Sequence, residues 1–209
     1  MDVVSALTFL GAAVVLTVMP GPDNLFVLAQ SIAKGKQAGI STTLGLCTGL
    51  FVHMTAAAIG LSAAVYQSAL AFNIVKYAGA AYLLYLAYRS FREKAASIML
   101  PDGNDSLDRK SLYKKGIVMN VLNPKVSLFF LAFLPQFVHG ENGRGATLQI
   151  LAYGIAFLVQ ALIIFTCISI FAGKIGGFLR QNPALAKRMN IIQGILFALI
   201  GFNIAFSQK

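Results

Sequence analysis

The sequence predicts an all-α polytopic membrane protein, and three observations predict this class. Hydrophobic residues make up 57% of the 209 residues and charged residues only 11%, whereas a soluble domain carries about 25% charged residues. Each apolar stretch is apolar on all sides, whereas a β-barrel would need segments of about 10 residues in which apolar and polar residues alternate. Six stretches come near the ~20 residues that cross a hydrocarbon core: 5–33, 38–64, 69–88, 116–138, 146–173 and 190–206.

The first stretch is interrupted near its middle by two prolines and a glycine, Pro20, Gly21 and Pro22, followed by Asp23. Proline removes a backbone N–H and clashes with the preceding turn, so we expect the helix to break here. Pro22 suits the first position of a new half-helix. Asp23 would then lie in its first turn, where the helix dipole favours a negative charge.

The second stretch carries small residues and one histidine. Gly45 and Gly49 are four residues apart, a spacing that lets two membrane helices approach closely. His53 follows on the predicted outer side of the midplane. It is either a neutral buried histidine bonded to a carbonyl or a proton relay, since its pKa lies nearest physiological pH. The third stretch, rich in glycine and alanine, is expected to serve helix packing.

A polar segment, 92–115, separates the third stretch from the fourth and reads as a cytoplasmic linker, because it has mixed charge and no apolar period. The fourth stretch is broken by Asn123, Pro124 and Lys125. Asn123 is a good N-cap and Pro124 a good first helical residue. Lys125 would then oppose the helix dipole, so an anion should compensate it. Asp23 or a bound carboxylate could serve.

The fifth and sixth stretches are apolar, with a few polar residues at depth. Such residues either line a cavity or hydrogen-bond between helices. The same two readings apply to a set spread over the spans: Asn24, Gln30, Asn120, Gln160, Gln193 and Asn203.

Basic residues sort by loop and predict the topology. Thirteen of the 17 Lys and Arg residues fall in alternate loops. The positive-inside rule puts these loops in the cytoplasm and both termini outside. The basic residues concerned are Lys34, Lys36, Arg89, Arg92, Lys94, Arg109, Lys110, Lys114, Lys115, Lys174, Arg180, Lys187 and Arg188.

The linker divides the chain into two units of three spans each, 1–91 and 116–209. Because three is odd, the two units must have opposite orientations, and inverted repeats of this kind are a common plan of transporters. Pro22 and Pro124 each break the first span of a unit, and a charge follows each directly. The sequence therefore predicts six transmembrane helices in two inverted repeats, with the first and fourth helices broken.

Both charges are predicted to lie near the bilayer midplane. Asp23 precedes Lys34 by 11 residues, roughly 16 Å of helix, and Lys125 follows Lys115 by 10 residues, roughly 15 Å. A charge at this depth costs about 2.5–3.5 kcal/mol and faces a protein interior or a wet cavity. An α-amino acid would fit, with its ammonium toward Asp23 and its carboxylate toward Lys125. The alternatives are a permanent Asp23–Lys125 salt bridge and proline kinks that only serve packing.

Four segments carry a family resemblance: PGPDN in the first span, KYAGAAYLLYLAYR (76–89) in the third, NPK in the fourth and FLPQF (133–137) at its end. Together they resemble the LysE/RhtB family of bacterial amino-acid exporters over essentially the whole chain. The resemblance implies a six-span exporter in the cytoplasmic membrane, driven by proton antiport. By motif position it implies transport roles for the following residues: Pro20, Gly21, Pro22, Asp23, Asn123, Pro124 and Lys125.

The sequence offers no sign of an enzyme, since it holds two histidines, no phosphate loop and no nucleotide motif. No cofactor, metal or nucleic acid is expected. The expected partners are an amino-acid substrate, protons, the lipid bilayer and, as an option, a second copy in a homodimer. Two rival functions stay open. One is transport of another cargo, such as a cation or another metabolite, and the other is a membrane scaffold without cargo.

Overall fold

The chain is all-helical in the residues that its computed structural model describes, namely 3–19, 21–67, 69–92, 108–138, 143–181 and 183–206. The elements, in chain order, are α1 (Val3–Val18), α2 (Pro22–Lys34), α3 (Lys36–Gln67), α4 (Ala69–Arg92), α5 (Arg109–Val121), α6 (Pro124–Leu128), the π-helix η1 (Phe129–Phe133), the 3₁₀-helix η2 (Leu134–Phe137), α7 (Gly143–Gln181) and α8 (Pro183–Phe206).

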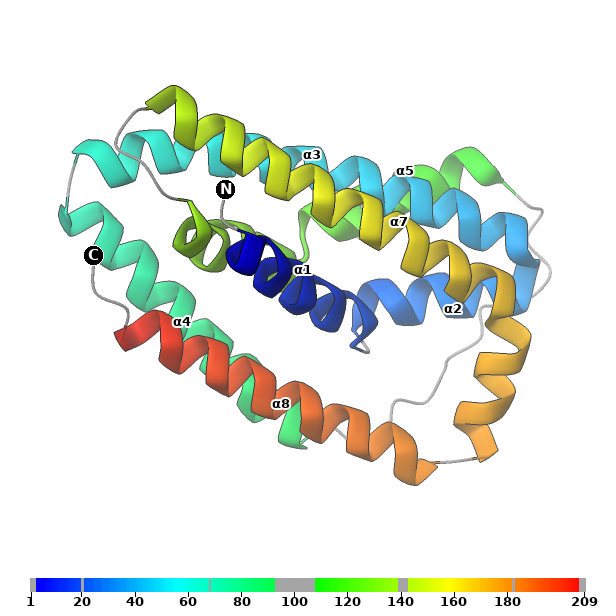
Figure 1. Cartoon of the computed structure of the whole chain (residues 1–209). Coiled ribbons are helices and arrows are strands. Elements are labelled where there is room, and N and C mark those ends of the chain that lie inside the picture. Colours follow the sequence, from blue (N-terminus) through cyan, green and yellow to red (C-terminus); the bar gives the residue numbers. More distant parts are fainter. Residues whose placement is uncertain are drawn as a thin grey trace.

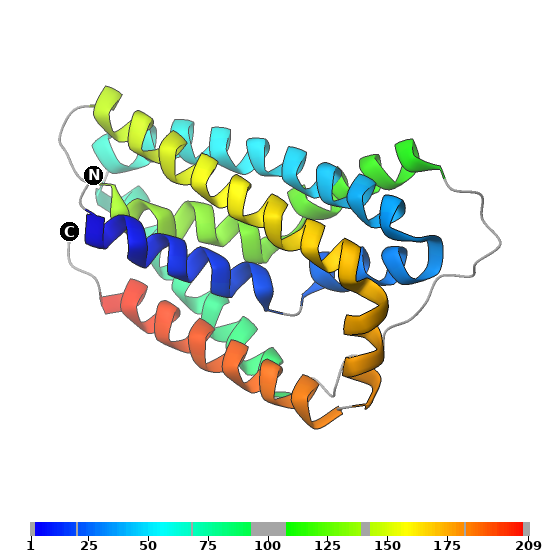
Figure 2. The same ribbon diagram turned by 45° about the vertical axis from the view of Figure 1, so that its right-hand side comes forward.

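The helices form one elongated bundle (Figure 1). Helix α3 packs against α5 and α7, and α2 packs between α3 and α7. Helices α4 and α8 pack mainly on each other, along the side of the bundle opposite α3 and α7. Both described ends of the chain lie at the same end of the bundle in both views, and the α2–α3 turn and the start of α5 lie at the other (Figure 2).

Two helices are long and apolar enough to cross a membrane on their own, over Lys36–Ile59 in α3 and Gly145–Gly176 in α7. Two bent pairs raise the number to four if each pair is one span. These are α1 with α2, bent by 52°, and α5 with the segment Pro124–Phe137, bent by 47°. The described residues therefore support two to four spans, and the count of six stays a prediction.

Both predicted helix breaks are confirmed. Helix α2 begins at Pro22 with Gly21 as its extended N-cap, and Asp23 lies in its first turn. Helix α6 begins at Pro124, and the Asn123 side chain accepts a hydrogen bond of 3.0 Å from the Lys125 backbone N–H. Pro20 lies outside the described residues.

One boundary differs from the prediction. Helix α5 begins at Arg109, inside the segment 92–115 that was predicted to be a linker. Asp108 is the reason, because its carboxylate accepts a hydrogen bond of 3.0 Å from the Lys110 N–H and caps the helix. The remaining linker residues, 93–107, lie outside the described residues.

Small residues bring α3 and α5 into backbone contact, as the glycine spacing predicts. A Cβ atom added at Gly45 would lie 2.1 Å from the Tyr113 carbonyl oxygen, and one added at Gly116 would lie 2.5 Å from the Thr42 carbonyl oxygen. A Cβ at Gly49 would lie 2.8 Å from the Asn120 side chain. The first half of the broken span is thus held tightly against α3.

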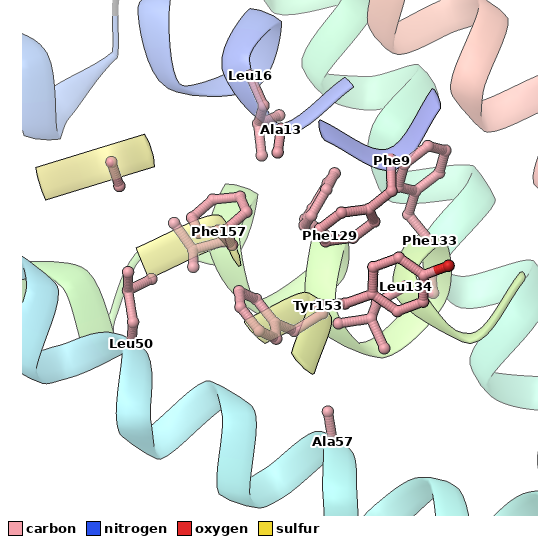
Figure 3. Packing of buried hydrophobic residues seen from close by; sticks show 14 of the residues in the cluster. Phe9, Ala13, Leu16, Leu50, Ala57, Phe129, Phe133, Leu134, Tyr153 and Phe157 are labelled. Carbon is pink, nitrogen blue, oxygen red and sulfur yellow. The ribbon is translucent and has the colours of Figure 1, made fainter. Parts of the chain in front are cut away.

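Aromatic residues fill the core between the cavity and the end of the bundle where the termini lie. Figure 3 shows Phe9, Phe129 and Tyr153 gathered together, with Phe157 beside Phe129. The ring centroids of Phe9 and Tyr153 are 4.6 Å apart and those of Phe129 and Phe157 are 5.1 Å apart. Phe129 opens the π-helix η1, and π-helical turns are rare and frequently lie at functional sites.

Candidate functional site

The first break frees backbone carbonyls at the end of α1, and side chains from elsewhere take them. The Asn24 side-chain amide donates to the Thr17 carbonyl oxygen at 2.6 Å. The Lys125 ammonium donates to the Met19 carbonyl oxygen at 3.3 Å. The carbonyl end of a helix carries partial negative charge, so the end of α1 is a favourable place for a cation.

The second break leaves the Asn120 carbonyl without its usual helical donor, because Pro124, four residues later, has no N–H. The Asn120 oxygen accepts instead from the backbone N–H of Asn123 at 2.9 Å. His53 Nε2 lies 3.0 Å from the same oxygen and is its second partner. A carbonyl only accepts, so Nε2 carries the proton and donates. His53 is thus a buried histidine bonded to a carbonyl, one of the two predicted alternatives, and its role as a proton relay stays a prediction.

The two breaks meet around a small cavity of about 20 Å³, room for about one water molecule. Six of the predicted site residues line it: Gly21, Asp23, Asn24, Asn120, Asn123 and Lys125. Pro22, Pro124 and His53 are not among the described lining residues; the prolines set the helix starts, and His53 stands behind Asn120. Residues more than 90 positions apart in the sequence therefore share one site, as predicted.

Asp23 and Lys125 do not form an ion pair of 4.0 Å or less in the described part of the chain. The Asp23 carboxylate accepts from the Asn120 amide at 3.4 Å, while the Lys125 ammonium bonds Met19. Both side chains are buried, at 5% and 8% exposure. Each charge thus remains available for a further partner, which argues against a permanent salt bridge between them.

Two oxygens of the cavity lack a hydrogen-bond donor among the residues that the structure describes. These are Asp23 Oδ1 and Asn120 Oδ1, both buried, and both residues line the cavity. A buried acceptor without a donor costs about 1–3 kcal/mol. The cavity therefore presents two acceptor oxygens and, on Lys125, one ammonium. These groups are complementary in charge to a cation and to an anion.

The apolar wall of the cavity was not predicted. It comes from the end of α1 and from α3, α6 and α7. Because these stretches are apolar on all sides, no pattern in the sequence marks the face that lines the cavity. Thr17, at the end of α1, also lines the cavity and was missed. The apolar lining residues are Leu16, Leu46, Leu50, Val126, Phe157, Ala161 and Phe165.

Among the described residues, no group of three or more His, Cys, Asp or Glu side chains is placed to hold a metal ion. Asp23 is the one carboxylate among the described lining residues of the cavity. The described lining residues therefore offer hydrogen bonds, one buried carboxylate and one buried ammonium.

Comparison with known proteins relates the chain to a family of translocators. Residues 14–208 match the family model described as LysE type translocator. A homoserine/homoserine lactone efflux protein of Salmonella typhimurium is 32% identical over 200 residues, which cover 96% of this chain and 95% of the relative. An uncharacterized membrane protein of Vibrio cholerae is 31% identical over 208 residues, which cover 100% of both chains. No solved structure matches the chain significantly.

Proposed function

Since the chain belongs to the LysE type translocator family, we propose that it is a secondary active transporter that exports amino acids or related small metabolites across the bacterial cytoplasmic membrane. Its family consists of membrane transporters, so the chain is not an enzyme. The efflux relative from Salmonella typhimurium supports export of an amino acid-like cargo. We take homoserine, which that relative's name gives, as the first cargo to test.

The observation that carries this proposal is the pair of broken helices around the cavity. The substrate ammonium would lie against Asp23 Oδ1 and Asn120 Oδ1, the two acceptors without donors. The substrate carboxylate would lie against Lys125, whose ammonium has remaining N–H groups beside its bond to Met19. Zwitterion recognition by broken helices near the midplane is a recurring plan of secondary transporters.

Proton antiport follows from the same carboxylate. The substrate ammonium and a proton would compete for Asp23, so an inward-moving proton would release the substrate outside. One charge moved across ~100 mV yields about 2.3 kcal/mol, and a tenfold gradient costs about 1.4 kcal/mol. A single proton at ~150 mV would then sustain a substrate gradient of roughly 300-fold.

The transport cycle would alternate access around this cavity. In the closed state about one water fits, so the walls must separate to admit a substrate. Six spans in two inverted repeats, with both termini outside, would give the two matching broken helices. The packing of α3 on α7 and of α4 on α8 supports such a repeat, since an axis relating the units maps each pair onto itself.

An efflux assay tests the proposal. Cells that produce the chain and control cells are loaded with dipeptides containing homoserine, threonine, valine, leucine or lysine, and the appearance of free amino acid outside is followed. We expect faster export of at least one of them, and its loss on adding a protonophore. Equal efflux from both cell types across the panel would contradict the function, and protonophore-resistant export would contradict the coupling.

A further inference from the structure

A third buried oxygen without a donor lies beside the cavity, on Gln160. Gln160 stands at the middle of the apolar stretch Gly145–Gly176 of α7, and its side chain is 7% exposed. A polar side chain at the centre of a membrane span is costly and is usually retained for a partner or for a function.

The hydrogen bonds around Gln160 fix the direction of its amide. The Thr17 hydroxyl lies 2.8 Å from the Ala13 carbonyl oxygen, to which it must donate. Its oxygen can therefore only accept from Gln160 Nε2, which lies 2.9 Å away. The Gln160 amide nitrogen is thus used between helices, whereas Oε1 has no donor among the described residues.

Gln160 stands directly behind the cavity wall. Thr17, to which it bonds, lines the cavity, and so do Phe157 and Ala161 on the same helix. Because the cavity has room for only about one water, its walls must separate to admit an amino acid, and α1 and α7 form one of those walls. The Thr17–Gln160 contact lies in that wall.

We propose that Gln160 Oε1 accepts a hydrogen bond from an uncharged donor, such as a hydroxyl, on the side chain of the transported amino acid. The inference rests on the proposed function and assigns the third acceptor within it. Asp23 and Lys125 are the only charged groups among the described lining residues, and the substrate's own ammonium and carboxylate occupy them. The side-chain donor recognised by Gln160 is therefore uncharged.

Threonine and valine form the decisive pair of cargoes, because they differ by a hydroxyl in place of a methyl group. Wild type should export threonine roughly tenfold better than valine, the size of one hydrogen bond. In Gln160→Met, which keeps the length and removes the acceptor, the ratio should fall to near one. Gln30→Met is the matched control, since Gln30 is also a buried glutamine whose Oε1 has no partner among the described residues. Gln160 differs from it by its bond to Thr17, a lining residue of the cavity.

The measurement is export of each amino acid at matched membrane levels of the three proteins. A Gln160→Met ratio equal to that of wild type, or an equal loss in Gln30→Met, would overturn the inference. If Gln160→Met does not reach the membrane, Gln160→Leu, which also removes the acceptor, is measured in its place, with the same ratio near one expected. A wild type that exports threonine and valine equally also overturns the inference while leaving amino-acid export intact. Export of no amino acid in the panel overturns the proposed function, and the inference falls with it.

Discussion

The ammonium of Lys125 donates a hydrogen bond of 3.3 Å to the carbonyl oxygen of Met19. This bond joins the second broken span to the freed carbonyl end of the first. It also offsets an unfavourable interaction: Lys125 lies in the first turn of α6, where the helix dipole opposes its positive charge. The negative end of α1 supplies compensation while Asp23 stays out of contact, which leaves room for a substrate anion to compete.

The contact of α3 with α5 should tolerate no side chain at Gly45. A Cβ atom there would lie 2.1 Å from the backbone oxygen of Tyr113, which cannot move without displacing α5. We expect Gly45→Ala to lower the unfolding free energy by about 1–3 kcal/mol, seen as a lower Tm of the purified protein. Gly11→Ala is the control, since an added Cβ there meets nothing within 4 Å. Equal Tm values for the two variants would contradict this packing.

His53 should be needed as a hydrogen-bond donor rather than as a titrating group. Its Nε2 donates to the Asn120 carbonyl, which also accepts from the Asn123 backbone N–H. We expect His53→Gln, which keeps a donor, to retain most export, and His53→Leu to lose about 0.5–1.5 kcal/mol of stability together with export. Efflux and thermal unfolding are measured on both. A stable but inactive His53→Gln would instead make His53 the proton relay.

The topology should show in labelling by a membrane-impermeant maleimide. Both native cysteines, Cys47 and Cys167, are first replaced by alanine. Val3→Cys, near the N-terminus and 71% exposed, should react in intact cells. Ser111→Cys, in the first turns of α5, should react only after the cells are permeabilised. Labelling of Ser111→Cys in intact cells would contradict the predicted orientation and indicate the opposite one.

The breaks and their charges could be predicted because local chemistry determines them. Pro22 and Pro124 cannot continue a helix, and Asn123 is a natural N-cap, so each half-helix starts where the sequence indicates. Counting helical rise from the membrane edge predicts a similar depth for Asp23 and Lys125, and both residues line the same cavity.

The partners of these groups could not be predicted, because they depend on how distant helices pack. Nothing in the sequence near Lys125 indicates that its ammonium bonds Met19, or that Asp23 bonds Asn120. The same holds for Thr17 and its bond to Gln160 across two helices. The early start of α5 was missed because the capping role of Asp108 was overlooked within a polar segment.

The most direct test of the account is export by wild type, Asp23→Asn, Lys125→Gln and the double variant at matched membrane levels. If the two residues were only a structural pair, removing both would restore what removal of one loses, since a single change leaves an unpaired buried charge. They bond Asn120 and Met19 instead of each other. We therefore predict that the double variant folds, inserts and exports nothing. Near-normal export by the double variant would contradict a substrate site between them.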